Sequence, residues 1–202
     1  MTLRELNLDE IRRLYREELL RTFPPSELKP LKAIEGLYTT GRYQVLGAFE
    51  EEELLGYALM WLEPGIQFAL LDYLGTVEGK RNGGIGAQII ALLGDHYAHY
   101  RGVFGEAEGV FSSDPEEAAM QARRLGFYER NGFRYGGYDC ALYGVHYQTL
   151  IRGDEDVTAE ELLEAHQAIY KGQIPPELYR RFIQIPLAEG EEPNPVGDWV
   201  EE

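Results

Sequence analysis

The chain has 202 residues, of which 44% are hydrophobic and 27% are charged. This is the composition of a globular protein with a packed core, and it excludes a disordered or fibrous protein. The 19 lysines and arginines are outnumbered by 35 aspartates and glutamates, which gives a net charge of −16 at pH 7. Such a charge repels nucleic acid and anionic membranes, so the sequence predicts neither as a partner.

The sequence gives no sign of membrane insertion, export or metal binding. No stretch contains the roughly 18 consecutive apolar residues of a spanning helix, and the first residues, MTLRELNLDEIRR, lack the apolar core of a signal peptide. We therefore expect a cytoplasmic protein. Cys140, the only cysteine, fits no metal-ligand spacing and is expected to be a small, partly buried apolar residue. His96 and His99 share a helix but have no evident third ligand, so no metal site is predicted.

Two helices and a hairpin are predicted in the first 64 residues. Asn7 with Glu10 three residues later is a capping-box pattern, and the helix that it starts is expected to end before Phe23. A weaker helical pattern covers residues 27–37. Two runs rich in Val, Leu, Tyr and Phe then flank the acidic residues 50–53, which predicts an antiparallel hairpin with a solvated turn.

The middle of the chain predicts a strand, a glycine-rich turn and a helix. The apolar segment IQFALLDYLGTV, residues 66–77, is typical of a central strand covered on both faces. A glycine cluster, Arg81 to Gly86, follows it, and an apolar helical stripe then runs from Ile85 to His96. A short strand at 102–109 comes next, and this order requires at least one parallel pairing.

The next helix is marked by its end signals. Asp114 can cap it, Pro115 suits its first position, and Glu117 completes a capping-box pattern. Asn131 and Gly132 are expected to end it.

The remaining segments complete an α+β chain. Residues 133–152 predict two strands, a last helix begins at Thr158 and closes near Gly172, and the acidic tail after Pro186 is expected to be loosely held. We therefore predict a single α+β domain over 1–202, with a mixed, centrally antiparallel sheet that holds one parallel pair and is flanked by helices.

The glycine cluster suits an anion. Glycines can adopt positive φ before a helix start, where unpaired N–H groups meet the positive end of the helix dipole. The cluster is not a Walker loop, because no Gly-Lys-Ser/Thr follows, and it does not fit a Gly-x-Gly-x-x-Gly dinucleotide fingerprint. From the residues alone, a phosphate site and a tight strand-to-helix turn both stay open.

Two motifs resemble a known family. YLGTVEGKRNGGIGAQII is similar to the acyl-CoA-binding segment of the GNAT superfamily of N-acetyltransferases, with Arg81, Gly84 and Gly86 at its characteristic positions. RRLGFYERNGF, residues 123–133, resembles the second motif of that family, and the likeness covers about 43–150, the core of the domain. GVFGEAEG before an acidic helix also resembles a bacterial subset known mostly as predicted acetyltransferases. The C-terminal helix and acidic tail, 151–202, are covered only loosely.

The resemblance implies a binding site for acetyl-CoA as cosubstrate, with the parallel pair of strands at that site. The end of the strand would pair with the pantetheine arm and polarise the thioester carbonyl, although Thr76 stands where the family usually has Val. Main-chain N–H groups of the turn would hold the pyrophosphate. The residues concerned are, for the strand, Leu74, Gly75 and Thr76, and, for the turn, Arg81, Asn82, Gly83, Gly84, Ile85, Gly86 and Ala87.

The resemblance also places Tyr128 where the family often has a general acid near the sulfur of CoA. A general base is harder to assign. Glu106 and Glu108 lie two apart and would share a strand face, where a carboxylate beside another has a raised pKa. They are equally well explained as an exposed face or as partners of Arg123 or Arg124. Asp72 is a lesser candidate, and a chain of waters could replace any base.

These features predict an N-acetyltransferase that moves acetyl from acetyl-CoA to a primary amine, on a small molecule or a peptide. The negative charge favours a small cationic acceptor. An acyl-CoA-binding or regulatory module without turnover is the alternative, and a homodimer is left open. We expect the acceptor site to involve the first two helices, the strands around Glu106 and the C-terminal segment.

Overall fold

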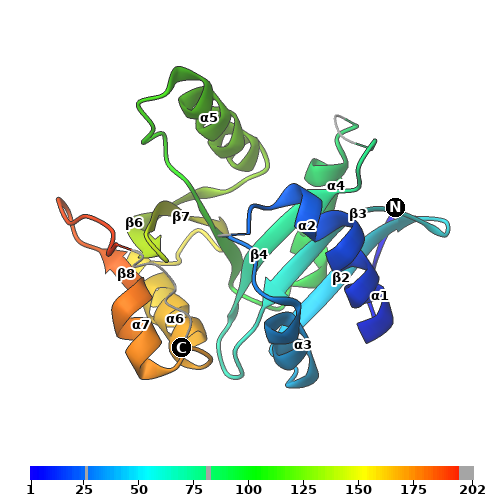
Figure 1. Cartoon of the computed structure of the whole chain (residues 1–202), viewed down its shortest axis with the longest axis horizontal. Coiled ribbons are helices and arrows are strands. Elements are labelled where there is room, and N and C mark those ends of the chain that lie inside the picture. Colours follow the sequence, from blue (N-terminus) through cyan, green and yellow to red (C-terminus); the bar gives the residue numbers. More distant parts are fainter. Residues whose placement is uncertain (26, 81–82, 196–202) are drawn as a thin grey trace. The chain divides into compact units, whose positions relative to one another are not determined.

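The computed structural model describes residues 1–25, 27–80 and 83–195 (Figure 1). The chain divides into two compact units, Met1–Gly65 with Ala69–His99, and Ile66–Phe68 with Tyr100–Glu202. The single domain expected over 1–202 stays a prediction. Arg81 and Asn82 of the glycine cluster lie outside the described residues.

The first unit contains an antiparallel meander. Its strands follow one another in space as they do in the sequence, and each is antiparallel to the next. The predicted hairpin is confirmed, with Glu51 and Glu52 between its two strands. The N-terminal strand was not predicted, because four residues are too few for a clear alternating pattern. The strands are β1 (Thr2–Glu5), β2 (Tyr43–Glu50), β3 (Glu53–Trp61) and β4 (Phe68–Thr76).

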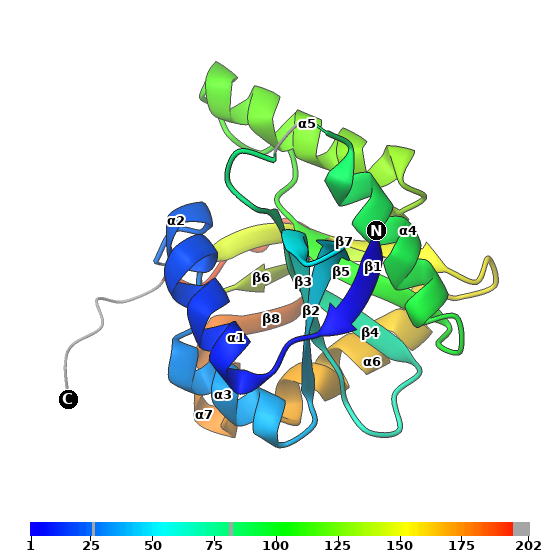
Figure 2. The same cartoon turned by 90° about the vertical axis from the view of Figure 1, so that its right-hand side faces the viewer.

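Helices cover both faces of this meander. Figure 2 shows α1, α2 and α3 on one side of the strands and α4 on the other, as expected for a strand buried on both faces. The predicted capping box of Asn7 and Glu10 is present. The helices are α1 (Leu8–Leu14), continued by the π-helical turn η1 (Tyr15–Leu19) and by α2 (Leu20–Thr22), then α3 (Leu31–Thr39) and α4 (Ile85–His96).

The second helix begins later than predicted. It was expected from residue 27, but α3 begins at Leu31 with Pro30 as its N-cap, in an extended conformation with ψ of 143°. Proline disfavours helical conformation in the residue before it, which is Lys29. The described residues from Phe23 to Pro30 therefore form a connection and not a helix.

The second unit contains four strands in the order β5-β7-β6-β8, all antiparallel to their neighbours. The last strand was not predicted. Its residues Ile183, Ile185 and Leu187 alternate inward and are buried, and it pairs with β6. The strands are β5 (Gly102–Ala107), β6 (Arg134–Leu142), β7 (Val145–Gly153) and β8 (Ile183–Leu187).

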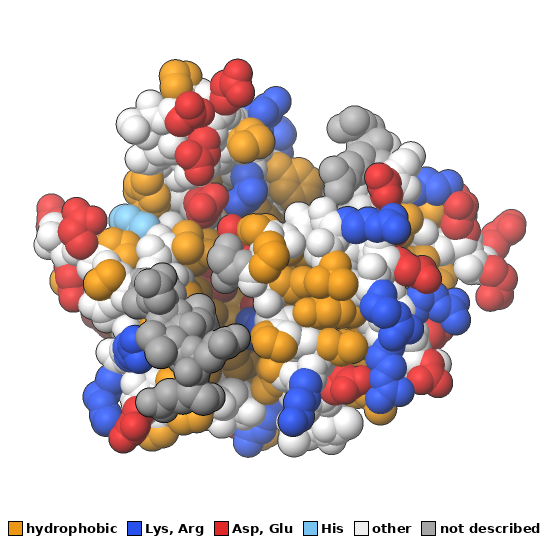
Figure 3. Space-filling view, viewed as in Figure 1, with side chains coloured by type: hydrophobic (Ala, Val, Ile, Leu, Met, Phe, Trp, Pro, Cys, Tyr) orange, Lys and Arg blue, Asp and Glu red, His pale blue; other side chains and the backbone are white. Residues whose placement is uncertain are grey.

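Three helices accompany these strands: α5 (Pro115–Arg130), α6 (Ala159–Lys171) and α7 (Pro176–Phe182). Asp114 caps α5 as predicted, but Glu117 accepts a hydrogen bond from the Ser112 hydroxyl and does not complete a capping box. The helix predicted from Thr158 is confirmed as α6. Most of α5 is exposed, and Figure 3 shows charged side chains of both signs over it.

The expected α+β class, an open mixed sheet with one parallel pair and flanking helices, is confirmed. None of the described helices is long and apolar enough to cross a bilayer.

Candidate functional site

The predicted strand and helix are present in the first unit, and the described part of the glycine cluster, Gly83 to Gly86, lies at the start of the helix. Gly84 is the N-cap of α4 with φ of 72°, a left-handed conformation that favours glycine. The first helical bond of α4 runs from the Gln88 N–H to the Gly84 carbonyl, so the N–H groups of Ile85, Gly86 and Ala87 lie ahead of the helical ladder. Glycine has no side chain to accept from them. The start of α4 therefore offers donors at the positive end of a helix dipole.

The end of β4 is held closely against β3. Tyr57 lies opposite Gly75 and Gly56 opposite Thr76 in the antiparallel register. A Cβ added at Gly75 would lie 2.3 Å from both the Cζ and the hydroxyl of Tyr57, so only glycine fits there. Leu74, Gly75 and Thr76, which sequence reasoning singled out, thus form a well-defined strand end that precedes the turn to α4 in the same unit.

A β-bulge changes the directions of the side chains in the middle of β4. The register passes from Leu59 opposite Tyr73 to Met60 opposite Leu71, which leaves Asp72 as the extra residue. Neighbours in a regular strand point to opposite faces, but a bulge breaks this alternation. As a result, Asp72 and Tyr73 both reach Lys29, which lies between α2 and α3.

Lys29 is held by its side chain and by its backbone. Its Nζ lies 2.8 Å from each carboxylate oxygen of Asp72, and its N–H donates to the Tyr73 hydroxyl at 2.9 Å. Tyr43 also donates a hydrogen bond to Asp72. The ammonium lies 4.7 Å from the ring centre of Trp61 and 5.4 Å from that of Tyr73. The lesser candidate Asp72 thus belongs to a mostly buried ionic and aromatic cluster.

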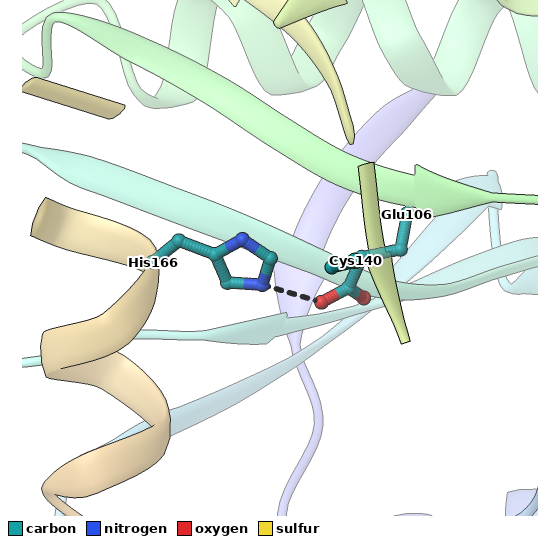
Figure 4. Close-up of side chains that lie close together, drawn as sticks. All are labelled: Glu106, Cys140 and His166. Carbon is teal, nitrogen blue, oxygen red and sulfur yellow. Dashed lines mark hydrogen bonds and ion pairs between the residues drawn. The ribbon is translucent and has the colours of Figure 1, made fainter. Parts of the chain in front are cut away.

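Glu106 belongs to a buried network in the second unit. His166 Nε2 lies 2.9 Å from its Oε1 (Figure 4). The Tyr170 hydroxyl donates to the same oxygen at 2.9 Å. His166 Nδ1 lies 3.0 Å from the Tyr138 hydroxyl. His166 is fully buried and the Glu106 side chain is 8% exposed. Burial raises the pKa of Tyr138, so its hydroxyl stays protonated and can donate to the imidazole.

Glu108 makes a different contact. It follows β5 and forms an ion pair with Arg124 at 3.2 Å, which is the structural alternative that the sequence left open. Glu106 and Glu108 therefore have separate partners, and a general base at either position stays a prediction.

No metal site was predicted, but three donor atoms of types that zinc accepts lie close together. Atoms of Glu106, Cys140 and His166 lie within 4.8 Å of one another. The Glu106 and His166 atoms already bond each other, and burial raises the pKa of the Cys140 thiol well above its usual value. Because the thiolate is the form that binds metal, this environment fits zinc poorly. The absence of a metal stays a prediction.

Tyr128 lies near the end of α5. Its ring packs edge-on against Phe127 and Phe133, with ring centres 5.4 and 5.3 Å apart. Burial raises the pKa of Tyr128, and the positive charge of Arg124 partly offsets this. The hydroxyl is thus protonated at neutral pH, as a general acid must be. Its role in catalysis stays a prediction.

Sequence reasoning missed Lys29, Trp61, Tyr138 and His166 as members of polar clusters. Two signals pointed to such clusters, although neither identified the partners. An aspartate inside an apolar strand requires a buried partner, and His166 lies on the apolar stripe of α6 together with Leu162 and Ile169, where it must also find a partner. The identity of those partners depends on contacts between distant segments.

No family model matches the sequence, and no curated protein matches it significantly. Solved structures do match. A protein assigned to the GNAT family of acetyltransferases from Bacteroides thetaiotaomicron is 19% identical over 86% of this chain and 98% of its own, with a TM-score of 0.69. An acetyltransferase from Thermus thermophilus is 20% identical over 76% of this chain and 98% of its own, with a TM-score of 0.56.

A third structure carries ligands. Spermidine N-acetyltransferase from Vibrio cholerae, in complex with CoA and spermine, is 12% identical over 74% of this chain and 93% of its own, with a TM-score of 0.55. At these identities the likeness is one of fold. The chain therefore has the fold of the GNAT acetyltransferases.

Proposed function

We propose that this chain transfers an acetyl group from acetyl-CoA to a primary amine. The observation that carries the proposal is the start of α4, where a left-handed Gly84 follows the end of β4 and presents main-chain donors. An anion such as the pyrophosphate of CoA suits those donors. The shared fold, which includes a structure in complex with CoA, supports the same assignment.

The described residues suggest how the donor would be held. The N–H groups of Ile85, Gly86 and Ala87 would bind pyrophosphate oxygens, together with the neighbouring turn residues that the sequence singled out. The edge of β4 that does not face β3, at Leu74 to Thr76, would bond the pantetheine arm and polarise the thioester carbonyl. Both tasks use the backbone, so most side-chain substitutions there should have little effect.

The transfer itself needs two proton movements. A neutral amine attacks the thioester carbonyl carbon, the carbon–sulfur bond breaks, and the amine nitrogen loses a proton. We assign protonation of the departing thiolate to Tyr128, whose raised pKa keeps it protonated. The amine proton would pass to Glu106, to Glu108 or to water.

A small cationic amine is the proposed class of acceptor. The net charge of −16 attracts cations, and one protein of the same fold is named for acetylating spermidine. The direct test is release of free thiol from acetyl-CoA across a panel of amines, combined with calorimetric titration of acetyl-CoA. Binding without thiol release for every amine would favour a binding module, and no binding would refute both functions.

A matched pair of variants tests the site. Gly84→Val and Gly41→Val both place a side chain at positive φ, 72° and 71°, and a Cβ meets nothing within 4 Å at either position. The strain is therefore similar at the two sites. We expect Gly84→Val to abolish acetyl-CoA binding and Gly41→Val to retain it. Equal affinity in two folded variants would refute the assignment of the α4 start.

A further inference from the structure

Trp61, Asp72 and Tyr73 contact the ammonium of Lys29, and Tyr43 donates a hydrogen bond to Asp72. We call these four residues the ammonium enclosure. Asp72 supplies two oxygens at 2.8 Å, and the faces of Trp61 and Tyr73 lie 4.7 and 5.4 Å from the nitrogen. Distances below about 6 Å permit a cation–π interaction. The enclosure thus has the two elements that recognise an alkylammonium, a carboxylate and aromatic faces.

We propose that the enclosure is a binding site for one ammonium group of the acceptor, and that Lys29 occupies it until the acceptor displaces it. This inference rests on the proposed acetyl transfer and names its substrate class. The chain's own lysine stands in for the acceptor, because a lysine side chain ends in the same CH2–NH3+ group as an alkylamine.

A cation must occupy the enclosure when no acceptor is bound, because the empty enclosure would make the protein less stable. The Asp72 side chain is 7% exposed, so its charge is largely removed from water. Without the Lys29 ammonium, the Tyr43 hydroxyl is the hydrogen-bond donor to Asp72 that would remain among the described residues. A buried charge without its counter-ion strongly destabilises a protein. Lys29 avoids this when no acceptor is bound.

Lys29 can leave because its backbone is anchored separately. Its N–H donates to Tyr73, the Tyr73 hydroxyl donates to the Glu27 carbonyl at 2.7 Å, and Leu28 is buried. None of these contacts involves the ammonium. The Lys29 side chain is 24% exposed, whereas Trp61 and Tyr43 are each 1% exposed. The opening of the enclosure toward solvent therefore lies along the lysine stem.

The enclosure indicates which nitrogen would react. Asp72 and the aromatic faces stabilise the charged form of a bound amine, and an ammonium is not a nucleophile. The enclosed nitrogen is thus an anchor, and a second nitrogen must attack. A strand rises about 3.3 Å per residue, so Leu74 to Thr76 lie roughly 7–13 Å along β4 from Asp72. An acceptor with two amines separated by a short alkyl chain, a diamine or longer polyamine, fits this arrangement.

The test compares Lys29→Met with the unchanged protein. Methionine keeps much of the apolar stem but cannot compete for Asp72. If Lys29 occupies the enclosure for about nine-tenths of the time or more, its removal should lower the KM for 1,4-diaminobutane at least tenfold. The KM for n-butylamine, whose single nitrogen must react, should stay within about twofold, and kcat should change little for either amine.

Two controls isolate the enclosure. Arg4→Met also removes one positive charge from the first unit, but Arg4 pairs with Glu10, 48% and 29% exposed, outside the enclosure. We expect Arg4→Met to leave both KM values unchanged. In Lys29→Met/Asp72→Asn, the gain for 1,4-diaminobutane should disappear. An unchanged diamine KM in Lys29→Met, or an equal fall for both amines, would overturn the proposal.

Binding without acetyl-CoA separates this inference from the proposed function. Calorimetric titration of 1,4-diaminobutane should show tighter binding to Lys29→Met than to the unchanged protein, whether or not acetyl is transferred. Tighter binding with no turnover would refute only the acetyl transfer. If Lys29→Met unfolds because Asp72 is unpaired, 1,4-diaminobutane should restore its folding through ligand linkage, and 1,4-butanediol should not. Failure of the diamine to restore it would overturn the proposal.

Discussion

Replacing Gly75 by alanine should destabilise the protein although alanine is the more favourable residue in most settings. The new Cβ would lie 2.3 Å from Cζ and the hydroxyl of Tyr57, where real contacts stay above 3.0 Å. Tyr57 is fully buried, so its ring has little room to move. Overpacking of this kind costs about 1–3 kcal/mol, which lowers Tm by roughly 2–12 °C in a chain of this size.

Gly36→Ala is the matched control, because the same methyl group is added where it meets nothing within 4 Å. Gly36 is exposed inside α3, where alanine is favoured over glycine by about 0.5–1 kcal/mol. The two variants should therefore shift Tm in opposite directions in a thermal unfolding experiment. Gly75→Ala should also weaken acetyl-CoA binding, because it displaces the end of β4. A Gly75→Ala protein as stable as the unchanged chain would refute the close contact with Tyr57.

Three further substitutions or treatments test the site. Tyr128→Phe should lower kcat with little change in acetyl-CoA affinity, and unchanged turnover would remove Tyr128 from the mechanism. Because burial raises the Tyr128 pKa, the alkaline fall in kcat of the unchanged enzyme should lie above pH 10. The Cys140 thiol, fully buried with a raised pKa, should react with a thiol reagent only after unfolding, and fast reaction in the folded protein would contradict its burial. His166→Ala should reduce the free energy of unfolding, measured in urea, by about 3 kcal/mol, because Glu106 loses a buried partner. The loss should be much smaller when His166→Ala is made in the Glu106→Gln protein. Equal losses in both backgrounds would show that the two side chains are not coupled.

Much of the local structure follows from residues that act over short distances. Asn7 and Glu10, Asp114 with Pro115, and Thr158 with Glu161 mark helix starts because their hydrogen bonds lie within one turn of chain. The same holds for the turn into α4, where Gly84 has positive φ. Elements without such end signals, β1 and β8, were missed.

The polar clusters could not be predicted, because they join segments far apart in the sequence. Lys29 reaches Asp72 only because α3 starts late, at Leu31, and because a bulge turns Asp72 and Tyr73 toward the same neighbour. No short sequence pattern predicts the bulge in β4 or the course of the loop before α3. Glu106 was singled out as a possible base from its spacing to Glu108, but its partners His166 and Tyr170 come from a helix some 60 residues away. Spacing within one strand says nothing about such partners.

The strand β8 sets a limit on how far the chain can be shortened from its C-terminal end. It covers one edge of β6, whose other edge pairs with β7. A chain ending just after Leu187 would keep that cover, whereas one ending before Ile183 would expose the unpaired N–H and C=O groups of β6. Exposed edges of this kind add strands from other molecules. The shorter chain should therefore self-associate through β6, while the longer one should not.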